Sequence, residues 1–116
     1  MHEFSICGLL LKALDEEWKS LEPTPPGLES VTVVIGGLHQ VVPDYLQGAW
    51  SALTKETPYL GATLQLEFLE IRGACSQCEW VGTIQPPLFV CPDCGSPGVE
   101  MTQGKEMYIK KLEVKT

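Results

Sequence analysis

Apolar residues recurring at three- and four-residue steps near the start of the chain predict a helix over residues 4–21. The members of this series are Ile6, Leu9, Leu10, Ala13, Leu14, Trp18 and Leu21. Such spacing gathers them on one helix face, and the charged residues between them fall mostly elsewhere. The proline-rich stretch 22–27 cannot continue a helix and is predicted to be a linker.

A β-branched run and a second apolar stripe follow. Residues 31–35 are almost entirely valine, threonine and isoleucine and end at two glycines, which predicts a largely buried strand. Pro43 suits the first position of a helix, and Pro58 stops that helix. Its predicted apolar stripe consists of Leu46, Ala49, Trp50 and Leu53.

Two more strands complete the predicted core. Residues 62–68 alternate between apolar and polar side chains, which is typical of a strand with one buried face. Residues 107–114 predict another strand, and Lys110-Lys111 disturbs its alternation in a way that indicates a bulge. We therefore expect an α+β fold, with a small mixed three-stranded sheet packed by two helices on one face.

The cysteine-rich segment between the last two predicted strands is expected to be an inserted zinc-ribbon-like lobe. We expect residues 1–72 and 105–116 to form the α+β domain and residues 73–104 to form the insertion. Gly73 and Gly104 lie near its edges, where a hinge is expected. A lobe of this size is too small to fold on its own apolar surface, so a bound metal should supply folding energy.

Four cysteines spaced C-x2-C-x12-C-x2-C predict a metal site made of Cys75, Cys78, Cys91 and Cys94. Four thiolates fill the tetrahedral positions of zinc and leave none for substrate, so the site is expected to be structural. Pro92 and Gly95 suit a tight knuckle, Gly95 because it accepts a positive φ. Iron is the alternative metal, and disulfides are disfavoured because the chain is expected to be cytoplasmic.

The charge balance and the motifs exclude several classes of function. The formal net charge is −7, which argues against a nucleic-acid partner. The apolar stretch 6–14 is too short to span a membrane and contains Lys12, and Glu3 stands where a secretory signal carries basic residues. Cys7 is expected to be a small buried hydrophobe without a catalytic base. We expect no enzymatic activity.

The first three residues form a candidate site for a second metal. The Met1 amine, the His2 amide and the His2 imidazole can close consecutive chelate rings around one ion, and Glu3 adds a carboxylate or a further amide. Nitrogen-rich, near-planar donor sets favour Ni(II) and Cu(II) over zinc. The alternative is an ordinary chain end, with Glu3 placed favourably at the positive end of a helix dipole.

Several motifs together resemble the HypA/HybF family of nickel metallochaperones along the whole chain. They are Met1-His2-Glu3-x-Ser5-Ile6, Val34-Ile-Gly36 with Val41-Val42-Pro43-Asp44, the four-cysteine lobe, and Thr102-Gln-Gly104-Lys-Glu-Met107. The chain departs from the family's pattern at Gly48-Ala49-Trp50 and in lacking a histidine in the lobe. His39 has no counterpart that can be carried over, and we expect it on a surface loop.

The resemblance implies a nickel carrier. It implies that Met1, His2 and Glu3 bind Ni2+ as cargo and that the four cysteines hold structural Zn2+. It further implies delivery to the large subunit of [NiFe]-hydrogenase together with a HypB-type GTPase. The resemblance leaves open whether urease accessory proteins are further partners and whether the chain forms a homodimer. A zinc-ribbon interaction module without metal transfer is the competing hypothesis.

Overall fold

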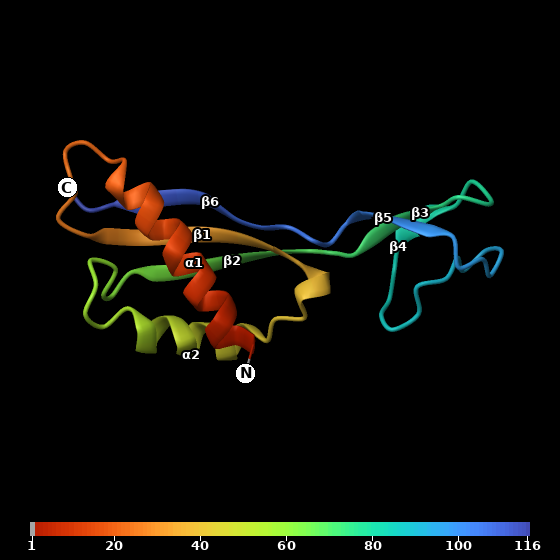
Figure 1. Cartoon of the computed structure of the whole chain (residues 1–116), viewed down its shortest axis with the longest axis horizontal. Coiled ribbons are helices and arrows are strands. Elements are labelled where there is room, and N and C mark those ends of the chain that lie inside the picture. The colour runs from red at the N-terminus through yellow and green to blue at the C-terminus, as the bar shows by residue number, and fades with distance from the viewer. Residues whose placement is uncertain (1) are drawn as a thin grey trace. The chain divides into compact units, whose positions relative to one another are not determined.

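The computed structural model describes residues 2–116. These residues form two α-helices and six strands, with a short 3-10 turn η1 at Gly37–His39, and Figure 1 shows their arrangement within each part of the chain. The bounds are α1 His2–Lys19, β1 Leu28–Gly36, α2 Pro43–Leu53, β2 Thr63–Leu69, β3 Arg72–Cys75, β4 Val81–Thr83, β5 Val99–Gln103 and β6 Met107–Val114. Among these residues no helix is long and apolar enough to cross a membrane.

Internal contacts divide the chain into two compact units. Unit 1 comprises the described residues up to Val34, with Val41–Glu67 and Tyr108–Thr116. Unit 2 comprises Ile35–Gln40 and Phe68–Met107. The predicted domain bounds at residues 73 and 104 stay a prediction.

The first sheet has the strand order β2-β1-β6. Figure 1 shows β1 and β2 running in the same direction and β6 in the opposite one, with α2 connecting the two parallel strands. The predicted mixed three-stranded sheet is thus confirmed. On central strand β1, Ser30 and Thr32 donate hydrogen bonds to the side chains of Glu113 and Gln65. Val33, on the opposite face, is almost fully buried.

The apolar stripe of α1 is narrower than predicted. Its buried side chains are Glu3, Ile6, Cys7, Leu10, Leu14 and Trp18. The prediction was wrong for Leu9, which is 64% exposed, and for Ala13, which is also exposed. Residues one position apart differ by about 100° around a helix, so Leu9 lies beyond the edge of a stripe that contains Leu10. In α2, Leu46, Ala49 and Trp50 are buried as predicted, whereas Leu53 is 39% exposed.

An aromatic cluster joins the elements of unit 1. Tyr59 contacts Trp18 edge-on, with ring centroids 5.4 Å apart, and stacks on Trp50 at 6.5 Å. The Tyr59 hydroxyl donates a 2.5 Å hydrogen bond to Asp15, and the Trp50 indole N–H donates one of 3.0 Å to the Ala62 carbonyl. The polar edges of these large rings are therefore satisfied inside the core.

The second sheet has the strand order β4-β3-β5 and lies in unit 2. β3 pairs antiparallel with both neighbours, with Gly73 opposite Gly82 on one side and Met101 on the other. These strands have only three to five residues each, and the sequence did not predict them individually.

Candidate metal centres

The four cysteine sulfurs converge in unit 2. Cys75 ends β3, Cys78 lies in the following turn, and Cys91 and Cys94 lie in the loop before β5. All four Sγ atoms lie within 4.8 Å of one another, with Cys75 to Cys94 at 3.7 Å and Cys78 to Cys91 at 3.6 Å. Tetrahedral zinc with Zn–S bonds of about 2.3 Å separates its sulfurs by about 3.8 Å, so these residues fit zinc. All of them are free thiols.

Backbone hydrogen bonds shape both knuckles. The Cys75 amide donates to the Trp80 carbonyl at 2.9 Å, and the Gln77 amide points at the Cys75 sulfur at 3.3 Å. In the second knuckle, the Gly95 amide donates to the Cys91 carbonyl at 2.8 Å. Gly95 has φ +74°, which confirms the predicted need for glycine after the second pair.

The thiols differ in their affinity for protons. The Gln77 amide lowers the pKa of Cys75 to about 7. For Cys78, the Trp80 amide lowers the pKa, but burial and the neighbouring thiols outweigh it and raise the value to about 12. The pKa of Cys94 is also raised, because burial and the Cys75 thiol outweigh the Ser96 amide. A divalent cation must therefore displace protons to bind all four sulfurs.

The amino-terminal candidate site begins at the limit of the described residues. Met1 lies outside them, and His2 is the first residue of α1. The His2 side chain is 52% exposed, whereas that of Glu3 is 3% exposed. One Glu3 oxygen, Oε1, lies 3.4 Å from His2 Nδ1, and the other, Oε2, accepts a 3.0 Å hydrogen bond from the Val42 amide. His2 and Glu3 are thus brought together, with His2 facing solvent.

Glu3 has a role that the sequence reasoning missed. Its carboxylate joins the start of α1 to Val42, which directly precedes α2. The Val42 amide is the main cause that lowers the pKa of Glu3, and burial opposes it. A signal was present, because Glu3 precedes Cys7 by one helical turn and so belongs to the buried stripe.

Two further residues singled out in the sequence belong to neither group of candidate ligands. Cys7 is fully buried, and burial raises the pKa of its thiol to about 11, as expected for a core residue. His39 ends the 3-10 turn, where its Nε2 lies 3.0 Å from the Lys105 carbonyl oxygen. The ring is partly exposed, in agreement with the expected surface position.

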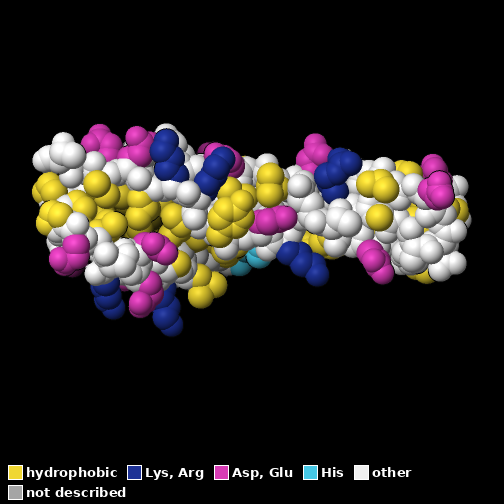
Figure 2. Space-filling view, turned by 90° about the horizontal axis from the view of Figure 1, so that it is seen from above, with side chains coloured by type: hydrophobic (Ala, Val, Ile, Leu, Met, Phe, Trp, Pro, Cys, Tyr) yellow, Lys and Arg dark blue, Asp and Glu magenta, His cyan; other side chains and the backbone are white. Residues whose placement is uncertain are grey.

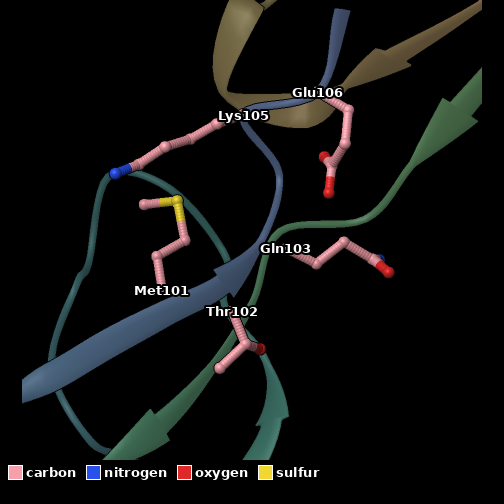
Figure 3. A pocket seen from close by; sticks show the side chains of 5 residues that line it. All are labelled: Met101, Thr102, Gln103, Lys105 and Glu106. Atoms are coloured by element: carbon pink, nitrogen blue, oxygen red, sulfur yellow. The ribbon is translucent and has the colours of Figure 1, made fainter.

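A cavity of about 290 Å³ in unit 2 is lined by Met101, Thr102, Gln103, Lys105 and Glu106. In Figure 3, Met101 and Lys105 extend to one side of the chain, and Gln103 and Glu106 to the other. Glu106 accepts a hydrogen bond from the Gly104 amide. The lining therefore offers no convergent set of ligands. Within residues 2–116, the four cysteines are the one cluster able to hold a metal through three or more cysteine, histidine or acidic side chains.

Comparisons with known proteins agree with these features. The model of the HypA family, described as "Hydrogenase/urease nickel incorporation, metallochaperone", matches residues 1–114. The hydrogenase maturation factor HypA of Geobacter metallireducens is 36% identical over 114 residues, which are 98% of this chain and 99% of that protein. Its counterpart from Desulfitobacterium hafniense is 34% identical, with 98% of each chain covered.

The fold is also similar to solved structures. The solution structure of the Ni metallochaperone HypA from Helicobacter pylori matches with a TM-score of 0.66 and 26% identity, covering 98% of this chain and 97% of that one. The chain therefore belongs to the HypA family, the nickel-incorporation metallochaperones of hydrogenase maturation, which are maturation factors and not catalytic enzymes.

Proposed function

We propose that this chain binds Ni2+ through the Met1 amine, the amide and imidazole of His2, and Glu3, and delivers it for maturation of [NiFe]-hydrogenase. The observation that carries the proposal is the exposed His2 imidazole at the first turn of α1, beside the ionised Glu3. A terminal amine titrates near pH 8, so a metal displaces its proton at little cost. The donors are few and partly exposed, which suits a cargo that must be released.

The first turn of the helix favours amide donors. The first four N–H groups of an α-helix have no intrahelical acceptor, so a metal can replace the amide proton without breaking the helix. Deprotonated amides together with an amine and an imidazole form the near-planar nitrogen set that Ni(II) prefers.

The contacts of Glu3 indicate which of its atoms binds nickel. Its carboxylate is buried and already accepts the Val42 amide. We therefore assign nickel binding at Glu3 to the backbone amide and assign the carboxylate the task of holding the first turn in place. Glu3→Gln keeps an acceptor oxygen for Val42 and should retain nickel, whereas Glu3→Ala should weaken nickel binding. An equal loss of nickel binding in Glu3→Gln and Glu3→Ala would instead favour the carboxylate as the ligand.

Cys75, Cys78, Cys91 and Cys94 are assigned to structural zinc, which would supply folding energy to an inserted domain at residues 73–104. Residues 1–72 and 105–116 form the nickel-binding domain in this proposal. Support comes from the spacing of the sulfurs, which matches a closed tetrahedral site.

The partners in this proposal follow from the family. They are a HypB-type GTPase and the large subunit of [NiFe]-hydrogenase, in the cytoplasm, with urease as a second client. Relatives named as hydrogenase maturation factors, and a family description that names both enzymes, support these assignments. A homodimer would be compatible with them.

The proposal is tested by nickel and zinc analysis of His2→Ala beside His39→Ala, the matched loss of the other histidine. His2→Ala should lose nickel and keep one zinc per chain, and His39→Ala should keep both metals. Nickel retained by His2→Ala would refute the assignment, and nickel lost from both variants would add His39 to the site.

A zinc-ribbon interaction module without metal transfer is the competing function, favoured by the four-cysteine cluster. It requires that His2→Ala leave hydrogenase maturation intact in cells, while Cys75→Ser abolishes partner binding. An iron–thiolate site would reveal itself by visible colour in the purified protein, and a colourless zinc-loaded sample would exclude it.

A further inference from the structure

Unit 2 has a second cavity, of about 220 Å³, on the side of the lobe that carries the segment between the cysteine pairs. We call it the lobe cavity. It is lined by Trp80, Thr83, Ile84, Gln85, Leu88, Val90 and Pro92. Its walls are mainly apolar, and none of these residues is a candidate metal ligand.

Large apolar side chains around this cavity are exposed to solvent. Leu88 is 69% exposed, Phe89 40% and Val90 41%, and they follow one another in sequence. Val81, which follows Trp80 at the start of β4, is 63% exposed. Single exposed apolar residues are common, but a consecutive group beside an apolar cavity marks an interaction site. Figure 2 shows a broader group of hydrophobic side chains on unit 1 as well, with acidic and basic groups mostly along its edges.

Trp80 forms a preformed wall of the cavity. Its ring packs over Gly82, where an added Cβ would lie 2.8 Å from the indole Cζ2 atom. The glycine therefore leaves room for the ring, and the side chain stays partly exposed. A half-exposed indole beside an apolar cavity is a typical anchor for a bound segment.

The neighbouring strand suits an extended ligand. β4 is the edge strand of the order β4-β3-β5, so an added segment can pair with its outer side. Alternate side chains of such a segment would lie beside Val81 and Thr83 of β4 and would reach the lobe cavity, whose lining includes Thr83.

The charge of unit 2 selects the kind of partner. It has two basic side chains, Arg72 and Lys105, and five acidic ones, a formal balance of −3. Glu79 and Asp93 directly border the lining residues Trp80 and Pro92 in sequence, and four thiolates around one divalent ion add about two negative charges. Arg72 forms an ion pair with Glu70, with 3.7 Å between a guanidinium nitrogen and a carboxylate oxygen, and so neutralises one of these acidic residues. A second copy would bring like charges together across a two-fold interface, which disfavours it.

We propose that the lobe cavity is a docking site for an extended segment of a partner protein that presents apolar side chains flanked by lysine or arginine. Apolar side chains fill the cavity between Trp80 and Leu88, and the basic flanks face Glu79 and Asp93. The site is independent of nickel binding at the amino terminus.

The test is a selection of random dodecapeptides displayed on phage against the zinc-loaded full chain. The affinity of the selected peptides is then measured by fluorescence anisotropy for the native chain and for the double variant Leu88→Ser/Val90→Ser. Leu9→Ser/Leu60→Ser is the matched control, because these leucines are 64% and 58% exposed in unit 1. Zinc content and nickel binding are measured on every variant, which keeps this test separate from the proposed carrier function.

We expect the selected peptides to combine at least two apolar residues with a net positive charge. Their affinity should fall about tenfold in Leu88→Ser/Val90→Ser, should be unchanged in the control, and should weaken as salt is raised. Absence of enrichment, acidic or uncharged peptides, or equal binding to both variants would overturn the proposal. A dimer in sedimentation velocity that dissociates on Leu88→Ser/Val90→Ser would also overturn it, because the occupant would then be a second copy.

Discussion

Replacing Gly36 by alanine tests the closest backbone packing in unit 2. Gly36 has φ −74° and ψ 149°, which alanine adopts without strain, so any penalty is steric. A Cβ at Gly36 would lie 2.1 Å from the Gly104 carbonyl oxygen, whereas real Cβ contacts stay beyond 3.0 Å. The two segments must therefore separate by about 0.9 Å, a figure that follows from these two distances.

That separation has a cost that can be estimated. Overpacking costs about 1–3 kcal/mol. Two hydrogen bonds beside the contact, Gly36 N–H to Glu106 O at 2.8 Å and Leu38 N–H to Gly104 O at 3.0 Å, would lengthen as well. With about 1 kcal/mol for each weakened bond, the total loss is about 3–5 kcal/mol. For a urea dependence of about 1–3 kcal/mol per molar, the unfolding midpoint should fall by roughly 1–5 M.

Gly48→Ala is the matched control, since a Cβ at this position of α2 meets nothing within 4 Å. It should stabilise the chain by about 0.5–1 kcal/mol, because alanine has the higher helix propensity. Both variants are compared by urea unfolding of the zinc-loaded chain, followed by far-UV circular dichroism. A Gly36→Ala midpoint equal to that of the native chain would refute the close packing of residues 36 and 104.

Three further predictions concern groups with unusual protonation. Burial and the hydrogen bond to Asp15 raise the pKa of Tyr59. Below about pH 10, the free energy of unfolding of Tyr59→Phe should therefore be about 1–2 kcal/mol lower than that of the native chain. Above that pH the difference should shrink, because the contribution of the protonated hydroxyl is lost as the pH rises. Urea unfolding of both chains at pH 8 and pH 11 checks this, and a difference that grows with pH would contradict it. Because Cys7 is fully buried and burial raises the pKa of its thiol to about 11, a thiol reagent added to the zinc-free chain should react much more slowly with Cys7 than with Cys75, whose pKa is about 7; equal rates at these two positions would contradict the burial of Cys7. Zinc binding at pH 7 should release protons, because the raised pKa values of Cys78 and Cys94 keep those thiols protonated, and it should weaken as pH falls through the pKa of Cys75, about 7; direct titration in weak buffer showing no proton release would count against a thiolate site.

Much of unit 1 could be predicted because its elements carry strong local signals. Pro43 marked the start of α2, and residues 107–114 matched β6 at both ends. Leu9 and Leu53 were misassigned because periodicity identifies a face but not its width, which depends on what packs against it.

The parts that could not be predicted depend on contacts distant in sequence. β3, β4 and β5 have three to five residues each and are half-exposed, which is too little for periodicity to identify them or their pairing. Burial of Glu3 depends on the Val42 amide, 39 residues away. The four cysteines themselves were predictable because their spacing alone encodes the geometry of two knuckles.

The central claim is that nickel binds at the free amino terminus. Its most direct test is a nickel titration of the zinc-loaded native chain beside one that carries a single extra residue before Met1. The extension removes the terminal amine from the donor set while leaving residues 2–116 intact. We predict one zinc in both chains and nickel binding at least about tenfold weaker in the extended chain. Equal nickel affinity in the two chains would contradict the account.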